Sequence, residues 1–528
     1  SFVYFGQMFM SLTPPHWCKP PETVRGYNLS DEEIKMLTIP QNNETGSFSK
    51  CTRYDVDYTQ VVWNLQLKMP KGAPRAVSME GGGWRSDISI FNPRRNCDLH
   101  WVCDDDWKPT FCQSLFFFGS LVGSPLFGWL ADAVGRLPII ITTNVLAGVA
   151  GVASSFANDL TTFGALRFMV GMTFDSQLVI VYIMSMEYVS AEYRTIMANV
   201  PLMVFMCASM CALPWIALAI SNWSTFAIAI HTPQLFFILL FWVIPESARW
   251  LISKGRVDDA VTIVRQAGKA NQRELSETVI SEFRNYCERM KEEKLPETTI
   301  LDLFKTPVLR RRFILLCIMW MVIVIAYDGH MRNTEHLGDN VFITFTLAGL
   351  VEAPADFLLI LLVEWLGRRH STVLTLIGSG IISFIISILD TDNFTVVLAV
   401  AMVGRFLITM SLNVGQQYTV EVLPTVARAQ GNGAIHTLGF LAIAASPSIV
   451  YLSKYALWFP YIIMGVASVA GGLLSIFLPE TVNEKLPDSL EDGETFWQDQ
   501  GLCYDPCHKT YIGRGRLRIR SHQEETHV

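Results

Sequence analysis

The chain has 528 residues, of which 51% are hydrophobic and 17% charged, and its formal net charge is -7. Soluble proteins carry about 25% charged residues, so this composition and a mean hydropathy of +0.31 indicate a membrane protein. The loops show no stripe of Lys and Arg, which argues against a nucleic-acid partner. The sequence also lacks a phosphate-binding Gly-rich loop, a zinc-ligand spacing and a nucleophile elbow. We therefore expect no ATP-driven pump, no enzyme, no cofactor and no metal site.

The first apolar segment is too short to cross a bilayer. Residues 1–13 supply about a dozen apolar residues, whereas a crossing needs about 20. We interpret this segment as the outer part of a truncated first helix. A secretory signal peptide is the alternative, but no basic region precedes the apolar residues.

Long runs without Asp, Glu, Lys or Arg predict the next membrane helices. The longest runs are 109–131, 195–245, 429–453 and 455–479, with Lys454 between the last two. The run 195–245 is long enough for two crossings joined at the polar turn 221–224. Weaker candidates are centred near residues 147, 172, 321, 352, 380 and 407. With the truncated first helix, the sequence predicts an all-α membrane protein of twelve transmembrane helices.

The membrane helices divide the chain into segments on two sides of the bilayer. We expect an extracellular loop at 14–108, helices 2–6 at 109–245, a cytoplasmic linker at 246–312, helices 7–12 at 313–479 and a cytoplasmic tail at 480–528. Short loops rich in Lys and Arg remain in the cytoplasm, and the loops at 134–136, 192–194 and 367–369 fit this rule.

Glycosylation signals and cysteines agree with this sidedness. The four Asn-x-Ser/Thr acceptors all fall in predicted exterior loops and are Asn28, Asn43, Asn222 and Asn393. The extracellular loop also carries four cysteines, Cys18, Cys51, Cys97 and Cys103. An oxidising exterior permits two disulfides among them. Three pairings satisfy the sequence equally well.

An internal repeat relates the two halves of the chain. Three motifs recur at offsets of 232, 234 and 234 residues: Asp132-x-x-Gly135-Arg136 as Glu364-x-x-Gly367-Arg368, Glu187 with Arg194 as Glu421 with Arg428, and Pro245-Glu246-Ser247 as Pro479-Glu480-Thr481. Nearly equal offsets predict two homologous six-helix halves. Parallel halves with a site between them are typical of secondary transporters.

The repeated charges predict a reversible gate at the cytoplasmic ends of the halves. In alternating access, contacts between the halves form in one state and break in the other. Exposed ion pairs are worth about 0–1 kcal/mol each, so a network of them suits such a gate. The candidate residues are Asp132, Arg136, Glu187, Arg194, Glu364, Arg368, Glu421 and Arg428. The alternative is that these charges only anchor loops.

Ionisable side chains at membrane depth mark a candidate substrate path. The acidic candidates are Asp175, Asp328, Glu352 and Asp356, and the basic ones are Arg167, Arg405, His330 and His436. Internal pairing is the alternative, for example of Asp175 with Arg167. Aromatic faces stabilise a desolvated cation by about 0.5–2 kcal/mol, and the candidates for an aromatic wall are Tyr327, Phe345, Phe440 and Trp215.

Several motifs together resemble a known transporter family. GWLADAVGR resembles the loop between helices 2 and 3 of the major facilitator superfamily, and PESARWLISKGR resembles its motif after helix 6. HWC, LVEAPADF, EVLPTVARAQG and LPETVNEKLPD narrow the resemblance to solute carrier family 22, the organic cation, carnitine and organic anion transporters. It covers residues from about 14 to about 492. YDGHMRN and FDSQLVIVYIMSMEY are most similar to arthropod-type members labelled organic cation transporter-like.

The resemblance implies a major facilitator fold and roles for particular residues. Glu352 matches the acidic position of the family's LVE-x-P motif in the central cavity. Tyr327 and Asp328 match its aromatic and polar pair in helix 7. At a helix 11 position where cation transporters carry an acid and anion or carnitine transporters carry a base, this chain has Phe440. The residue that usually indicates the charge of the substrate in this family therefore gives no indication here.

Three functions remain open from the sequence. The first is a plasma-membrane transporter of small organic cations or zwitterions that works by alternating access. The second is an organic anion transporter that uses Arg167, Arg405 and His436. The third is a receptor or adhesion protein with a transporter fold and a large extracellular loop. The expected substrate-binding residues of the first are Tyr327, Asp328, Glu352, Asp175 and Phe440.

Overall fold

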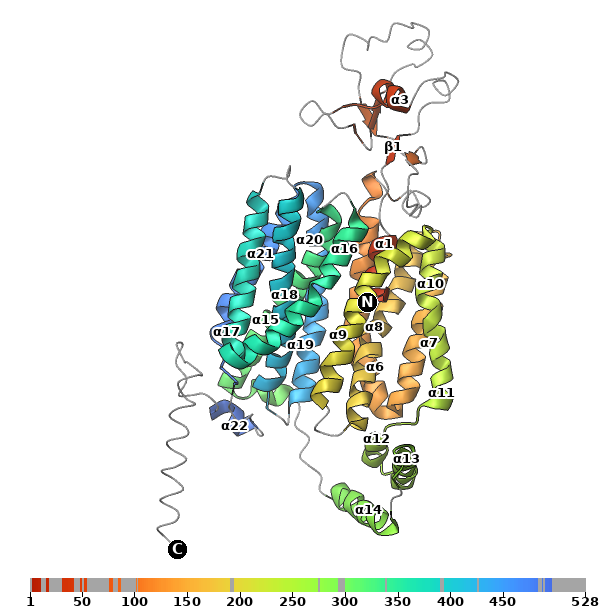
Figure 1. The fold of residues 1–528 in the computed structure, drawn as a ribbon, viewed down its shortest axis with the longest axis vertical. Helices are drawn as coiled ribbons and strands as arrows, with labels where there is room; N and C mark the ends of the chain where they lie inside the picture. The colour runs from red at the N-terminus through yellow and green to blue at the C-terminus, as the bar shows by residue number, and fades with distance from the viewer. Residues whose placement is uncertain are drawn as a thin grey trace.

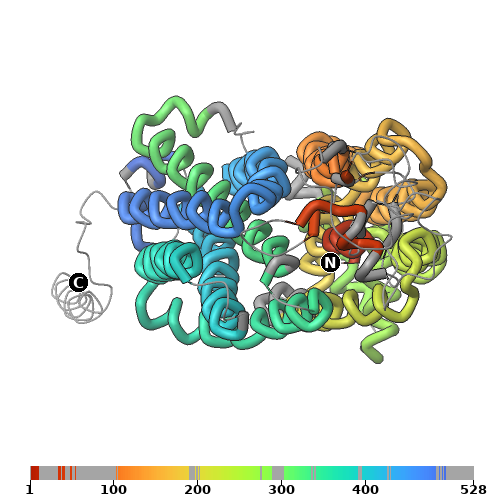
Figure 2. The backbone as a smooth tube through the Cα atoms, turned by 90° about the horizontal axis from the view of Figure 1, so that it is seen from above, coloured from red at the N-terminus to blue at the C-terminus, as the bar shows by residue number. Residues whose placement is uncertain are grey.

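A computed structural model describes most of the chain. The described residues are 2–10, 16–18, 31–41, 48–49, 52–54, 76–78, 84–86, 101, 103–189, 194–273, 276–292, 300–337, 340–389, 394–424, 427–482, 487 and 490–495. Long helices dominate them, and they form two bundles that lie side by side (Figure 1). Seen from above, the bundle of the N-terminal half and that of the C-terminal half are separate lobes in contact along one face (Figure 2).

The N-terminal half consists of one short and several long helices. They are α1 (Phe2–Met10), α6 (Lys108–Val134), α7 (Arg136–Ser154), α8 (Leu160–Tyr188), α9 (Arg194–Ile220) and α10 (Trp223–Leu235), which continues through η3 (Phe236–Leu239) into α11 (Leu240–Val243). The turn between α9 and α10 lies at Ser221, as the sequence predicts. Asn222 caps α10 by accepting hydrogen bonds from the amides of Ser224 and Thr225.

The C-terminal half repeats this arrangement. Its helices are α15 (Pro307–Arg332), α16 (Val341–Leu350), α17 (Glu352–Ile388), α18 (Phe394–Val422), α19 (Arg428–Ile443), α20 (Ser446–Tyr451) and α21 (Phe459–Ser475), with η5 (Asn333–His336) after α15 and η6 (Leu452–Lys454) after α20. The two runs that Lys454 separates in the sequence therefore become separate helical segments.

Shorter elements lie outside the bundles. The predicted linker contains α12 (Ala248–Ser253), α13 (Val257–Ala270), α14 (Glu277–Glu292) and η4 (Ile300–Phe304), and the predicted tail contains α22 (Leu490–Thr495). The predicted extracellular loop contains α3 (Asp31–Thr38), η1 (Cys103–Asp105) and two antiparallel strand pairs. β1 (His16–Cys18) pairs with β4 (Trp84–Ser86), and β2 (Thr52–Tyr54) pairs with β3 (Ala76–Ser78).

The bundle helices are long and apolar enough for a membrane. Among the described residues, 8 candidate spans meet the length and hydropathy that a crossing needs. One of them, Val341–Ile388, has 48 residues and bends at Gly367, so it holds more than one crossing. The helical membrane fold is confirmed, while the total of twelve helices stays a prediction.

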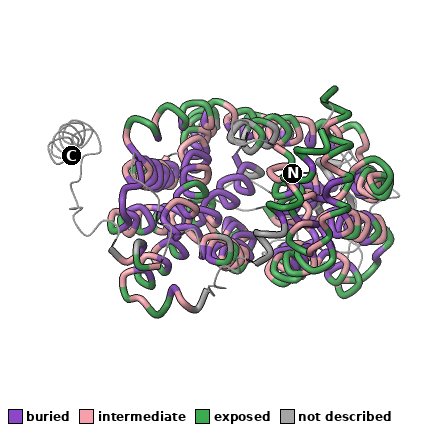
Figure 3. The backbone as a smooth tube through the Cα atoms, turned by 90° about the horizontal axis from the view of Figure 1, so that it is seen from below, coloured by how far each residue is buried: buried purple, intermediate pink, exposed green. Residues whose placement is uncertain are grey.

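The two ends of the bundle differ in what they carry. We call the end where α6 meets α7, beside α12–α14, the lower end, and the end where α9 meets α10 and α20 precedes α21 the upper end, as they appear in Figure 1. Seen from below, buried backbone lies inside each lobe and exposed backbone on its outer side (Figure 3). Exposed apolar side chains on those outer helices are expected where lipid replaces water as solvent.

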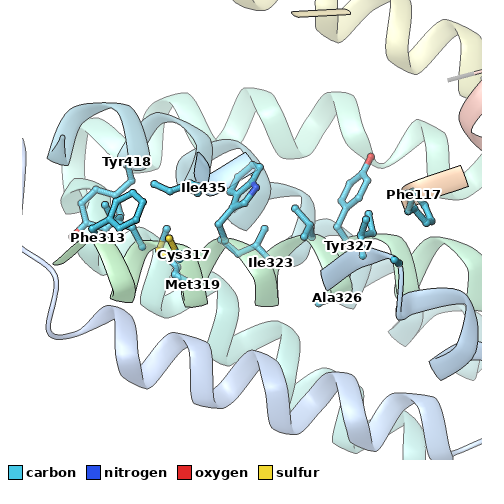
Figure 4. Packing of buried hydrophobic residues seen from close by; sticks show 14 of the residues in the cluster. Phe117, Phe313, Cys317, Met319, Ile323, Ala326, Tyr327, Tyr418 and Ile435 are labelled. Carbon is cyan, nitrogen blue, oxygen red and sulfur yellow. The ribbon is translucent and has the colours of Figure 1, made fainter. Parts of the chain in front are cut away.

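Helix α15 provides the core of the C-terminal half. Its apolar side chains line up from Phe313 to Tyr327 and face side chains of α18 and α19, including Tyr418 and Ile435 (Figure 4). Phe117 of α6 joins the same cluster at its upper end, so this core continues into the N-terminal half.

The repeated Gly-Arg and Pro-Glu motifs meet at the lower end. In the N-terminal half, the Glu246 carboxylate accepts hydrogen bonds from the backbone amides of Arg136 and Leu137, the first residues of α7. In the C-terminal half, Glu480 accepts from the amides of Arg368 and Arg369 after the bend in α17. Each carboxylate thus satisfies free amides at a helix start and complements the helix dipole.

Glycine is required at the residue before each of these helix starts. Gly135 has φ 130° and Gly367 has φ 82°, conformations that L side chains rarely adopt. A Cβ at Gly135 would lie 2.4 Å from Glu246 Oε2, and one at Gly367 would lie 2.5 Å from the Glu480 carboxyl carbon. The glycines of the repeat therefore allow the capping carboxylates to approach the backbone.

We predict that Gly135→Ala and Gly367→Ala each lower the stability of the purified protein by about 1–3 kcal/mol, because the left-handed backbone and the cap are both disturbed. Melting temperatures in detergent measure the effect. Gly128→Ala and Gly433→Ala are matched controls, since a Cβ at either position meets nothing within 4 Å. Equal melting temperatures for all four variants would contradict this explanation of the repeat.

Candidate functional site

Glu352 lies in a buried ion pair. Its carboxylate accepts a hydrogen bond from Arg405 Nη2 at 2.5 Å and another from the Tyr327 hydroxyl at 2.5 Å. Arg405 also donates to the Tyr327 carbonyl at 2.9 Å, and its guanidinium carbon lies 3.9 Å from the centre of the Tyr327 ring. Three predicted residues therefore come together, and the positive charge of Arg405 already balances Glu352.

Asp328 also has a basic partner. It is fully buried and pairs with Arg332 at 2.6 Å, one helical turn later on α15. The Tyr4 hydroxyl of α1 donates to the other carboxylate oxygen at 2.7 Å. Because Tyr4 belongs to the N-terminal half, this contact joins the two halves. Sequence reasoning missed Arg332, although the spacing of four residues in a helix is the signal for such a pair.

Asp175 and Asp356 have only neutral partners. Asp175 of α8 accepts a hydrogen bond from Ser124 Oγ of α6 at 2.6 Å. Asp356 of α17 accepts one from the Asn413 amide of α18. No basic side chain of the described residues lies within ion-pair distance of either carboxylate. Both side chains are half-buried.

The aromatic residues predicted to line the substrate path differ in burial. Phe345 is fully buried and packs on Phe5 and Phe9 of α1. Phe440 is half-buried against the core around α15. Trp215 is 48% exposed on the outer surface, which suits a lipid contact.

The two predicted histidines contact side chains of the C-terminal half, to which they belong. His330 contacts Ser383 Oγ at 3.1 Å. The His436 ring lies 4.5 Å from the Trp320 ring. Neither histidine contacts an acidic side chain among the described residues.

The predicted gate residues pair within each half. Arg136 lies 2.7 Å from Asp132 and 3.8 Å from Glu187. Arg368 lies 3.0 Å from Glu421 in the other half. In this structure these pairs therefore fix the lower end of each half and do not bridge the two halves, which differs from the simplest form of the gate hypothesis. The physical reason is that the repeat places the partners of each Arg on neighbouring helices of the same bundle.

The remaining gate candidates have other partners or none. Glu364 is exposed and forms no ion pair with a described residue. Arg428 donates to the Leu423 carbonyl at 3.2 Å. Arg194 begins α9, and its side chain lies outside the described residues.

Contacts between the halves gather from the middle of the bundle to the upper end. Lys454 lies 2.5 Å from Asp106, which also accepts a hydrogen bond from the Tyr451 hydroxyl. Ser114 Oγ of α6 donates to the Ala444 carbonyl at 2.8 Å. Sequence reasoning used Lys454 only as a boundary between apolar runs, but a lone charge between two such runs also signals a partner at the membrane surface.

The modification sites are only partly described. Asn222 is exposed at the upper end, while Asn28, Asn43 and Asn393 lie outside the described residues. Cys103 is disulfide-bonded. Cys18 lies in β1, and Cys51 and Cys97 lie outside the described residues. That the four cysteines form two disulfides therefore stays a prediction.

The sequence matches a family of membrane transporters. The family described as "Sugar (and other) transporter" matches residues 85–490. The chain is 31% identical over 502 residues to the Organic cation transporter protein of Drosophila melanogaster, covering 94% of this chain and 89% of that protein. It is 30% identical over 501 residues to mouse Solute carrier family 22 member 21, covering 93% and 87%. The chain belongs to the Sugar (and other) transporter family and, within it, to solute carrier family 22. It is thus a transporter and not an enzyme.

Other relatives and solved structures support the same assignment. The chain is 29% identical over 516 residues to the Beta-alanine transporter of Drosophila melanogaster, covering 94% of this chain and 84% of that protein. A partially occluded inward open structure of the xylose transporter XylE from E. coli has a TM-score of 0.56 at 17% identity and covers 71% of this chain and 90% of that chain. That likeness confirms the major facilitator fold.

We predict that Glu352 and Arg405 stabilise the fold as a pair. Arg405→Met leaves a buried carboxylate without its partner, which costs about 3–5 kcal/mol. The double variant with Glu352→Met as well regains most of that loss. Thermal unfolding of the purified single and double variants measures the coupling. Additive losses would mean that the two residues act independently.

Proposed function

We propose that this protein carries small organic cations or zwitterions across the plasma membrane by alternating access. The single observation that carries the proposal is the presence of two half-buried carboxylates, Asp175 and Asp356, which have no basic partners among the described residues of a family 22 bundle. A cation that leaves water needs a replacement for its hydration, and unpaired carboxylates supply it. The names of relatives agree, since they include an Organic cation/carnitine transporter 2 and a Carcinine transporter.

The distribution of contacts between the halves supports alternating access. The hydrogen bonds and ion pairs between described residues of the two halves lie from the middle of the bundle to the upper end, from Cys207 with Gly349 to Asp106 with Lys454. At the lower end, no hydrogen bond or ion pair between described residues joins the halves. This pattern is expected for a transporter closed at one end and able to open at the other.

The gate residues then act by stiffening each half. Asp132, Arg136 and Glu187 hold the lower ends of α6, α7 and α8 together, and Arg368 with Glu421 does the same for the other half. Rigid halves move as units, so the opening reverses when the contacts between the halves at the upper end break.

The orientation completes the proposal. We assign the lower end and the C-terminus to the cytoplasm, following the basic loops. The upper end then faces outward with the acceptor Asn222 and with Cys103. Asn28, Asn43 and Asn393 are proposed to be glycosylated on the same side.

We predict that Asp356→Asn and Asp175→Asn each reduce uptake of a quaternary amine about tenfold or more, because a charge-assisted contact is worth about 1.5–3 kcal/mol. Uptake of labelled tetraethylammonium, corrected for surface protein, measures this in cells that express the protein.

The control is Glu282→Gln, which removes an exposed carboxylate from α14, outside the bundles, and is expected to leave uptake unchanged. Normal uptake by both Asp variants would place the cation site elsewhere. If para-aminohippurate enters and the amine does not, the assignment of substrate charge is wrong.

A further inference from the structure

Arg167 is a buried charge without an acidic partner. It lies on α8 and has 0% exposure, and none of its three guanidinium nitrogens has a hydrogen-bond partner among the described residues. Its guanidinium carbon lies 5.0 Å from the centre of the Phe116 ring, whose face gives only a weak contact. An unpaired cation in a low-dielectric interior costs several kcal/mol. Such a side chain is retained where a ligand supplies the acceptors.

Arg167 lies beside an aromatic cluster that also contacts Arg332. Phe116 belongs to an aromatic cluster with Tyr4, Phe117 and Phe174. Arg332 of the other half lies 5.6 Å from the centre of the Phe117 ring. Arg332 pairs with Asp328, whereas Arg167 has no carboxylate of the described residues within ion-pair distance.

Other unsatisfied polar atoms lie on the same helices. Gln113 lies one turn before Phe116 on α6, is 3% exposed, and has no partner among the described residues for either its amide nitrogen or its amide oxygen. Arg332 Nη2 is also buried without a described partner. Native interiors satisfy nearly all such groups, so the unpaired guanidinium donors of Arg167 and Arg332 beside one aromatic cluster indicate a site for an acceptor with negative charge.

We propose that Arg167 binds the carboxylate of a zwitterionic substrate. The planar guanidinium matches a carboxylate with two parallel hydrogen bonds. This inference rests on the proposed function and refines it: Asp175 and Asp356 favour the ammonium end of the substrate, and Arg167 favours the acidic end. The substrate class is then a small amino acid or betaine.

The position of Arg167 gives a route for the carboxylate. It lies seven residues into α8, about 10 Å from the upper end of that helix. The aromatic cluster beside it is closed by the contact of Tyr4 with Asp328 between the halves. When the halves part at the upper end, this contact breaks and exposes the cluster next to Arg167.

Binding to the purified full-length protein tests the site without requiring transport. A ligand that binds the folded state raises its melting temperature. We expect γ-butyrobetaine to stabilise the wild type and its methyl ester, which lacks the carboxylate charge, to do so at concentrations roughly 10- to 100-fold higher. In Arg167→Met the two compounds should raise the melting temperature equally. Arg167→Lys should keep part of the preference for the acid over the ester. Equal stabilisation of the wild type by acid and ester overturns the proposal.

Uptake separates this proposal from the more general one. Arg167→Met is expected to keep tetraethylammonium uptake and to raise the KM for γ-butyrobetaine at least about tenfold. Equal loss of both substrates at normal surface expression means that Arg167 is structural, and overturns the site. If Arg167→Met fails to fold, the test uses the wild type alone. γ-Butyrobetaine and its methyl ester are then compared as inhibitors of tetraethylammonium uptake. Equal potency of the two compounds overturns the site.

Two further outcomes distinguish an inorganic anion at Arg167 from a failure of transport. If acid and ester are equally potent and uptake falls when chloride is replaced by gluconate, Arg167 holds an inorganic anion and the carboxylate site is overturned. If γ-butyrobetaine stabilises the wild type in preference to its ester but no amine is taken up, the site stands and the proposed transport function fails.

Discussion

The structure depends on one constraint: inside a bilayer no water is available to hydrogen-bond a charge or a free backbone group. Every charge must therefore find a partner within the protein or serve a ligand. The same rule applies to buried backbone groups at the lower end, where Glu246 and Glu480 each accept hydrogen bonds from the amides of a helix start in their own half. The ion pairs of Glu352 with Arg405 and of Asp328 with Arg332 show it again at membrane depth. The charged side chains that have no charged partner among the described residues then indicate function.

The unpaired charges fall into two kinds. Asp175 and Asp356 are carboxylates with neutral partners, and Arg167 is a guanidinium with none among the described residues. Paired charges hold helices in place, and their replacement is expected to cost stability. Unpaired charges cost stability in the absence of ligand and are retained where a substrate completes them. This distinction assigns structural and transport roles to side chains that look alike in the sequence.

Sequence patterns predicted the helical membrane fold and the family, because apolar runs and the repeated Gly-Arg motif depend on local spacing. The break at Lys454 and the turn at Ser221 follow from the same local signals. Partners across helices were harder to predict. Glu352 was expected to face substrate, and its pairing with Arg405 needs the packing of α17 against α18, which no local spacing encodes. Asp175 was weighed against pairing with Arg167 two turns away, yet the described structure gives it Ser124 instead.

The most direct measurement is a cryo-electron microscopy structure of the full-length protein with a bound quaternary amine. This account predicts that the ammonium group lies within about 5 Å of Asp175 or Asp356, at a distance where charge attraction is strong. It also predicts that Arg405 still pairs with Glu352. An ammonium group bound directly to Glu352, with Arg405 displaced, would contradict the division of charges into structural pairs and substrate ligands.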